Sequence, residues 1–149
     1  MFDAHALRGL LPRLRRHAFL LTASRLAGDA AVAMAIARLP RDADGRPQGR
    51  DLAQLFTLVQ EAARQVVCPH DGHLGPLHER LAALPPPQRA MLVLVTVEAL
   101  PAAEAAAICG LAAEDGAGAL TAARTALGSR MGSSRPRQRS GQGGGGARR

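Results

Sequence analysis

The near absence of large aromatic rings restricts the fold of this chain more than any other feature. Its 149 residues include three Phe and no Trp or Tyr, although 47% of them are hydrophobic. Sheet proteins rely on aromatic and β-branched side chains, whereas Ala and Leu pack well between helices. We therefore expect an all-α protein whose core consists mainly of Leu, Ala and Val.

Apolar side chains recur at helical spacing along most of the sequence. The clearest case is residues 51–67, where Asp51 is placed to cap the amino terminus of the helix. Pro12 is expected to end a first helix or to begin a second one, and Asp29 is expected to cap the third. The predicted helices, which precede a helix-turn-helix, cover residues 3–11, 12–24, 28–39, 51–67, 77–84 and 88–100.

Turn-rich breaks and a polar tail divide the chain. Pro, Gly and Asp are frequent in residues 40–50, and a second break at residues 68–76 separates two halves. The tail holds six Arg and no acid, so the overall net charge of +7 is a poor reason to expect nucleic-acid binding by the folded part. We predict two small helical subdomains over residues 1–68 and 77–128, a linker over 69–76 and a disordered tail over 129–149.

The segment that begins at Pro101 has the pattern of a helix-turn-helix, with Gly110 in the turn. A helix that reads DNA needs Arg, Lys, Asn or Gln at its start, but residues 114–120 read EDGAGAL. Residues 79–128 hold three Arg against five acids, which is unfavourable near a polyanion. We therefore expect no DNA-binding residues. The two glycines each cost about 1 kcal/mol inside a helix, so we expect this helix to fray until a partner packs on it.

The sequence contains no clear catalytic or metal-binding arrangement. His5, His17 and Ser24 lack the spaced partners that nucleophilic or acid–base catalysis needs. The residues around Cys68 lack the paired ligand spacing of zinc sites, so we interpret the nearby histidines as parts of a polar linker: His70, His73 and His78. Cys109 is expected in the core. We expect no enzymatic activity, no metal and no cofactor.

The amino-terminal residues do not form a secretory signal, because they lack its basic start. The longest apolar run, residues 90–97, is far shorter than the roughly 18 residues that suggest a membrane span. We therefore expect a cytoplasmic protein that is monomeric when free. The first 41 residues hold seven Arg against two acids, which would suit an acidic segment of a partner.

The second half combines a leucine-rich helix, the residues LPP, a buried helix, an acidic helix and a glycine turn, in RLAALPPPQRAMLVLVTVEALPAAEAAAICGL. This order resembles the region 4-like half of an extracytoplasmic-function sigma factor, which follows a region 2-like half. In the first half, LRRHAFLLTASRLAGDAAV and DLAQLFTLV resemble more closely the sigma-like domain of PhyR-type general stress regulators. The resemblance covers residues 5–127.

This resemblance implies a protein that mimics a sigma factor, captures an anti-sigma factor (NepR in that family) and so frees the true sigma factor. Residues 30–36 lack the polar side chains and the ring with which a working sigma factor grips RNA polymerase. Between residues 20 and 67 the only ring is Phe56, so stacking platforms for a melted promoter strand are missing. A PhyR-type protein continues into a receiver domain, so the resemblance leaves two expectations open: a standalone mimic or a truncated product.

We therefore expect an anti-sigma factor as the partner, with amphipathic helices that lie in a groove between the two halves. RNA polymerase and specific DNA are not expected to bind. Two alternatives remain open: a divergent sigma factor that binds core polymerase and promoter DNA, and an inert remnant. The candidate partner-contact residues are Val32, Ile36, Leu55 and Val59.

Overall fold

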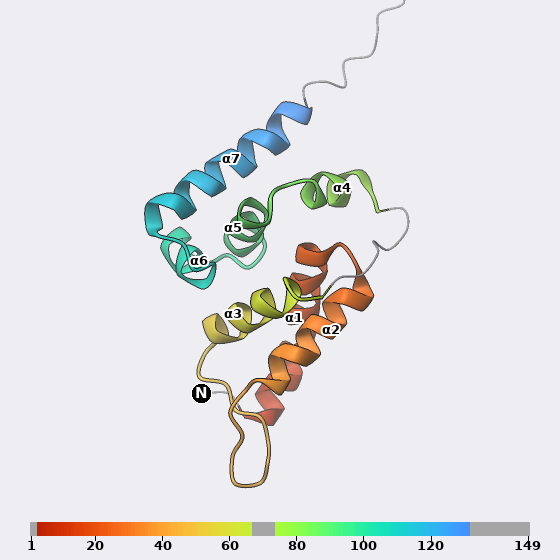
Figure 1. Cartoon of the computed structure of the whole chain (residues 1–149), viewed down its shortest axis with the longest axis vertical. Coiled ribbons are helices and arrows are strands. Elements are labelled where there is room, and N and C mark those ends of the chain that lie inside the picture. The colour runs from red at the N-terminus through yellow and green to blue at the C-terminus, as the bar shows by residue number, and fades with distance from the viewer. Residues whose placement is uncertain (1–2, 67–73, 132–149) are drawn as a thin grey trace, which may run out of the picture.

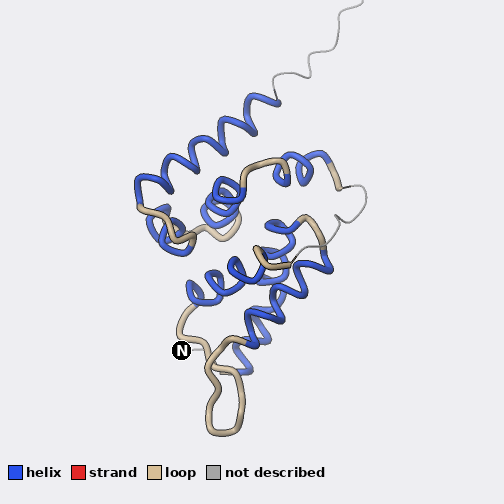
Figure 2. The backbone as a smooth tube through the Cα atoms, in the orientation of Figure 1, coloured by secondary structure: helices blue, strands red, loops and turns tan. Residues whose placement is uncertain are grey.

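The computed structural model describes residues 3–66 and 74–131, which form seven helices in two groups (Figures 1 and 2). The first group holds α1 (Ala4–Thr22), α2 (Arg25–Ala37) and α3 (Leu52–Ala63). The second holds α4 (Pro76–Ala82), α5 (Pro86–Thr96), α6 (Ala102–Ile108) and α7 (Ala113–Met131). The prediction of an all-α fold with two small helical subdomains is confirmed. Within the described ranges, no helix is both long and apolar enough to span a membrane.

The first group packs its three helices on one core, and α3 contributes several of its largest fully buried side chains. Leu55, Phe56 and Val59 have no exposed surface, and Leu14 of α1 is equally buried. Asp51 caps α3 as predicted, because its side chain accepts a hydrogen bond of 2.8 Å from the amide of Gln54. The single ring between residues 20 and 67 is therefore a core residue.

Helix α1 runs without a break through Pro12, so the prediction that Pro12 ends or begins a helix is wrong. A proline inside a helix removes one backbone hydrogen bond and costs about 3 kcal/mol or more. Apolar residues on both sides of Pro12 nevertheless face the same core: Leu7 is 5% exposed and Leu14 is fully buried. Burial of this continuous face explains why the helix persists.

Helix α2 begins three residues earlier than predicted, and Ser24 rather than Asp29 caps it. The Ser24 hydroxyl accepts a hydrogen bond of 3.3 Å from the amide of Ala27. Asp29 lies inside the helix and pairs with Arg15 of α1 at 3.1 Å on the exposed surface. The cap prediction failed because Ser24 and Asp29 are both good capping residues, and packing against α1 fixed the earlier start.

The second group surrounds α5, whose Met91 and Leu94 are fully buried. The prolines at 85–87 begin this helix as well as ending α4, since proline fits the first helical position. Gly110, with φ of 70°, makes the turn between α6 and α7. Helix α7 continues to Met131, three residues into the predicted tail. The rest of the tail and most of the predicted linker lie outside the described residues.

Candidate functional site

A buried acid, Glu98, connects the two groups of helices. It follows α5, and the amides of Glu98 and Leu100 donate to the carbonyls of Val93 and Leu94 at 3.1 and 3.0 Å, which turns the chain back on the helix. The Glu98 side chain is fully buried, and Oε2 accepts a hydrogen bond of 2.6 Å from Nε of Arg13 in α1. Arg13 also donates to the Glu98 carbonyl at 3.0 Å. This pair holds the loop after α5 against α1.

Two further residues of α1 face the same carboxylate. Arg16 Nη2 lies 3.5 Å from Oε2, and His17 Nδ1 lies 3.7 Å from Oε1. Burial alone would raise the pKa of Glu98, but the interactions with His17 and Arg13 outweigh it and lower the pKa to about 2. Burial lowers the pKa of His17, which packs on the ring of Phe56 with centroids 4.6 Å apart. Glu98 is therefore an ionised acid held chiefly by Arg13.

We expect acid to weaken the fold through Glu98. A carboxyl with a pKa of about 2 in the folded protein and 4.5 when unfolded stabilises the fold above pH 4.5, and this contribution is lost as the pH falls from 4.5 to 2. Glu98→Gln should flatten that slope in urea unfolding followed by circular dichroism. His17, whose pKa burial lowers from 6.5, adds a separate loss of stability that begins as the pH falls below 6.5, so the original protein and the variant are compared over the range from pH 4.5 to 2. If the stability of Glu98→Gln falls with pH as steeply as that of the original protein in this range, Glu98 is not the group responsible.

Arg89 makes a second connection between the two groups. From α5 it donates to the carbonyl of Leu21 at the end of α1, at 2.6 Å. It also donates to the carbonyls of Ala82 and Leu84 around the end of α4, at 3.0 Å in the case of Leu84. Burial lowers the pKa of this guanidinium. Three carbonyl dipoles, rather than an acid, thus face the charge of Arg89 within the described part of the chain.

An apolar groove of about 260 Å³ opens where α1, α4, α5 and α7 meet. Leu77 is 67% exposed and Val97 is 40% exposed, which is unusual for side chains of this kind. Contiguous exposed apolar surface on a soluble protein often marks a place where another protein binds. The walls between these two residues are formed by Leu20, Leu81, Leu92 and Leu127.

The helix-turn-helix presents few groups that could bind nucleic acid. At the start of α7 the exposed residues include Glu114, Asp115, Ala117 and Gly118. Leu120 and Ala123 face inward and are buried. The first two turns of this helix therefore offer acids and small residues where a DNA reader needs long polar ones. The expectation that no residue here reads DNA stays a prediction.

The four predicted partner-contact residues lie on α2 and α3, mostly inside the first group of helices. Val32 is 3% exposed, and Leu55 and Val59 have no exposed surface. Ile36 is half-buried at the edge of this core. With the helices packed in this way, a partner can reach Ile36 but not the other three.

The structure also places the other residues that the sequence analysis named. His5 is exposed, His17 lies beside Glu98, and Ser24 caps α2. Cys109 is buried, as predicted, and burial raises the pKa of its thiol. Among the described residues no three His, Cys, Asp or Glu side chains gather as metal ligands do. Cys68 and its two nearest histidines lie outside the described ranges, and His78 lines the apolar groove.

Sequence reasoning did not single out Glu98, Arg89 or the groove residues Leu77 and Val97. A lone Glu directly after the apolar run 90–97 was an available signal for a buried acid. Its partner Arg13 is 85 positions away, however, and no local pattern links the two. The groove likewise needs four helices, so its exposed apolar residues become visible only in three dimensions.

Comparison with known proteins gives a family match and solved structures of similar fold. Residues 74–114 match the family model described as sigma-70, region 4. No curated protein sequence matches the chain.

The first structure is the anti-anti-sigma factor PhyR complexed with the anti-sigma factor NepR, from Bartonella quintana, with 25% identity and a TM-score of 0.62. It covers 83% of this chain, which spans 48% of the PhyR chain. The second is the sigma factor RpoE in complex with NepR from the same organism, with 22% identity and a TM-score of 0.64. It covers 88% of this chain and 97% of the RpoE chain. This chain thus has a sigma-like fold similar to those of PhyR and RpoE, with a match to sigma-70 region 4 in its second half.

Proposed function

We propose that this chain mimics a sigma factor and binds an anti-sigma factor, and that it regulates stress-response transcription by exchanging partners. The observation that carries the proposal is the surface of the helix-turn-helix. Residues 113–118 of α7 contain two acids and no Arg, Lys, Asn or Gln. A region 4 without base-reading side chains can still present its shape to a protein. The proposal requires no catalytic group and places the protein in the cytoplasm.

The apolar groove is the proposed docking place for the partner. A helix with an apolar stripe would cover Leu77 and Val97, which are otherwise exposed to water. Both groups of helices form the groove, because Leu20 comes from α1 and Leu81 from α4. The partner would therefore hold the two halves together. Ile36, half-buried on α2, is a possible outer contact of the same partner.

The second candidate function is that of a divergent sigma factor. One observation favours it: the fold is as similar to that of the sigma factor RpoE, with a TM-score of 0.64, as to that of PhyR, with a TM-score of 0.62. A sigma factor must bind core polymerase and a promoter, so the two candidates differ in a measurable property.

Calorimetric titration separates the two candidates. The purified chain would be titrated with a NepR-like anti-sigma protein of its host and, separately, with core RNA polymerase. Tight binding to the anti-sigma protein without binding to polymerase supports the mimic. Polymerase binding together with promoter-dependent transcription would establish the divergent sigma factor instead.

The groove gives a sharper test of where the anti-sigma protein binds. Leu77→Gln should weaken binding about tenfold, since it removes apolar area worth about 1.4 kcal/mol from the interface. Leu26→Gln is the matched control, because Leu26 is 70% exposed and lies on α2 outside the groove. Both positions are exposed, so neither change should alter the melting temperature. Equal losses in the two variants would contradict docking in the groove.

A further inference from the structure

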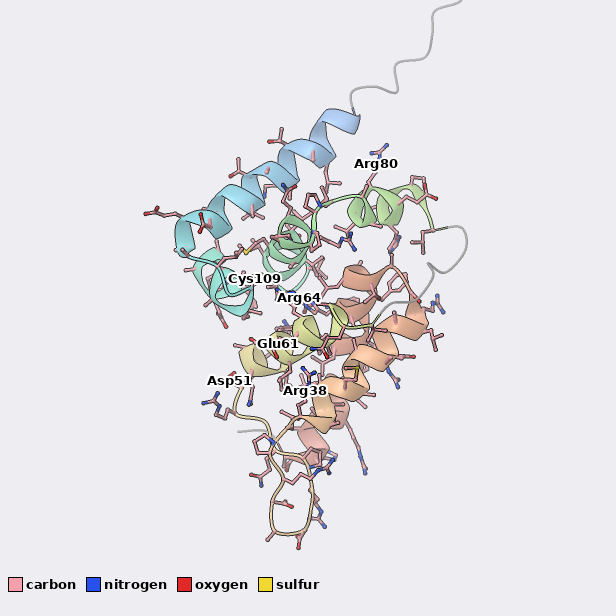
Figure 3. The ribbon with its side chains drawn as sticks, viewed as in Figure 1. Arg38, Asp51, Glu61, Arg64, Arg80 and Cys109 are labelled. Atoms are coloured by element: carbon pink, nitrogen blue, oxygen red, sulfur yellow. The ribbon has the colours of Figure 1, made fainter. Side chains whose placement is uncertain are left out.

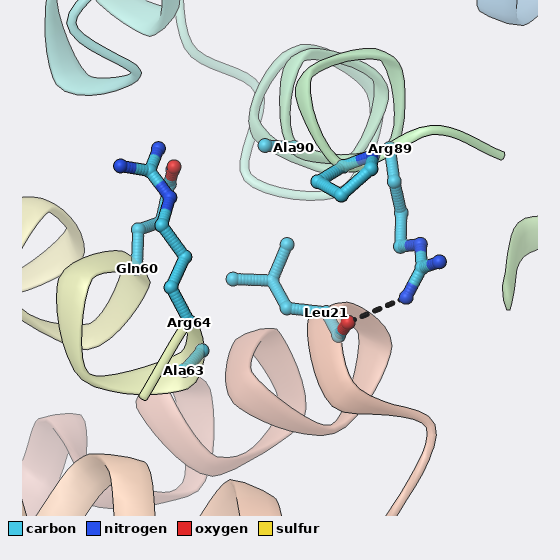
Figure 4. Close-up of a pocket in the computed structure, with 7 residues that line it drawn as sticks. Leu21, Gln60, Ala63, Arg64, Arg89 and Ala90 are labelled. Carbon is cyan, nitrogen blue, oxygen red and sulfur yellow. Dashed lines mark hydrogen bonds between the residues drawn. The ribbon is translucent and has the colours of Figure 1, made fainter. Parts of the chain in front are cut away.

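A second, smaller cleft lies at the junction, between α1, α3 and α5 (Figure 4). Its volume is about 130 Å³. Gln60 of α3 and Arg64, which follows the end of α3, lie along one wall. Arg89 of α5 forms the other, and Leu21 of α1 lies between them (Figure 4). Apolar surface from Ala63 and other small residues completes the lining. The cleft is thus apolar in part, with three polar side chains.

Gln60 is the most unusual of these side chains. It is 2% exposed, and among the described residues neither its amide nitrogen nor its amide oxygen has a hydrogen-bond partner. The Cys109 thiol, directly after α6, lies near this amide, but a thiol is only a weak hydrogen-bond partner. Buried polar groups are normally satisfied, and leaving one unpaired costs about 1–3 kcal/mol. Gln60 lines the cleft, so a polar group that entered it would supply the partner that this amide lacks among the described residues.

The two guanidinium groups add positive charge, and no acid among the described residues forms an ion pair with either of them. Arg64 is exposed near the boundary between the halves (Figure 3), and it forms no ion pair within the described residues. Arg89 uses both of its Nη atoms on carbonyls, while its buried Nε has no partner in the same part of the chain. None of the seven lining residues is acidic. Two cations and an unpaired amide at one partly buried place favour an anionic ligand.

We infer that this cleft binds the carboxylate of an acidic side chain on the protein partner. This inference deepens the proposed function, since it names the chemical group through which the partner is recognised. A guanidinium and an amide nitrogen can both donate to one carboxylate. Leu21, Ala63 and Ala90 offer apolar surface for the methylene groups of a Glu side chain.

The position of the cleft agrees with a protein partner. Leu20 lines the apolar groove and Leu21 lines the cleft, so the two sites flank the same end of α1. Helix α5 likewise lines both sites, with Val93 in the groove and Ala90 in the cleft. One partner could therefore occupy both. Nucleic acid is the less favourable ligand, because residues 79–128 hold three Arg against five acids.

The binding test uses small probes and does not need the partner. N-acetylglutamic acid amide would be titrated into ¹⁵N-labelled protein while the side-chain signals of Gln60, Arg64 and Arg89 are followed by NMR. We expect saturable shifts of these signals, and none with the neutral N-acetylglutamine amide at the same ionic strength. Absence of a saturable shift, or saturation by inorganic phosphate but not by the glutamic acid probe, would overturn the inference.

A pair of charge-removing variants checks that the cleft is the binding site. Arg64→Gln should weaken binding of the glutamic acid probe about tenfold. Arg124→Gln is the matched control, because Arg124 is exposed on α7 and outside the cleft. Equal weakening, or none, would count against the cleft. If the probe binds but no anti-sigma protein does, the proposed function fails while the carboxylate site stands.

Discussion

Replacement of Glu98 by alanine is expected to lower the free energy of unfolding by about 3–5 kcal/mol, the range seen when one partner of a buried ion pair is removed. The variant would leave Arg13 without its 2.6 Å partner and would remove the carboxylate that Arg16 faces at 3.5 Å. It would also leave a cavity, because the Glu98 side chain is fully buried. Urea unfolding at neutral pH measures the loss.

The exposed pair of Arg15 and Asp29 provides the control for this prediction. Its atoms are 3.1 Å apart, but both side chains are more than half exposed. Exposed ion pairs contribute about 0–1 kcal/mol, so Asp29→Ala should change the free energy of unfolding by less than 1 kcal/mol. Similar effects of the two variants would mean that Glu98 is not the buried connection that we describe.

Glu98 also matters for the proposed partner surface. Val97, which lines the groove, directly precedes Glu98, and Leu20 lies on the same helix as Arg13. The Glu98–Arg13 pair therefore fixes the distance between two walls of the groove. A partner that binds the groove needs these walls in place before it arrives, because preorganised surfaces avoid the cost of ordering on binding.

Local features of the fold were predictable where one residue determined them. Asp51 has a side chain suited to capping and is followed by a clear apolar stripe, so the start of α3 could be predicted. Pro12 shows the opposite case, because local preference for a break was overcome by burial of Leu7 and Leu14. Two capping residues, Ser24 and Asp29, competed for one helix start, and only the packing could decide between them.

The candidate site was harder to predict than the fold. A helical stripe shows which residues face the same way, but it cannot show whether another helix or a partner covers them. Val32 and Leu55 were therefore predicted at the partner surface, although α2 and α3 bury them against one another. Leu77 lies on a helix of seven residues, too short for a convincing stripe, and its exposure depends on where α4 packs.

The two glycines of α7 are expected to respond in opposite ways to alanine. A Cβ at Gly116 would lie 2.5 Å from the Cβ of Ala106 in α6 and 3.3 Å from its Cα. Because the backbone of α6 would have to move, Gly116→Ala should lower the free energy of unfolding by about 2 kcal/mol. A Cβ at Gly118 would meet no atom within 4 Å. Gly118→Ala should therefore raise it by about 1 kcal/mol, through helix propensity alone.

Urea unfolding of the two variants, together with amide exchange over residues 116–120, distinguishes close packing from simple helix weakening. If both alanine variants are more stable than the original protein, the only effect of Gly116 is to weaken the helix. The close approach of α6 to α7 would then not depend on a glycine at this position. If Gly116→Ala lowers the free energy of unfolding and Gly118→Ala raises it, the missing side chain at Gly116 allows α6 and α7 to pack closely. Gly118 would then only weaken the exposed face of α7. Slow exchange at residues 116–120 in the free protein would contradict the expected fraying. The shape of the helix-turn-helix would then be complete before any partner binds.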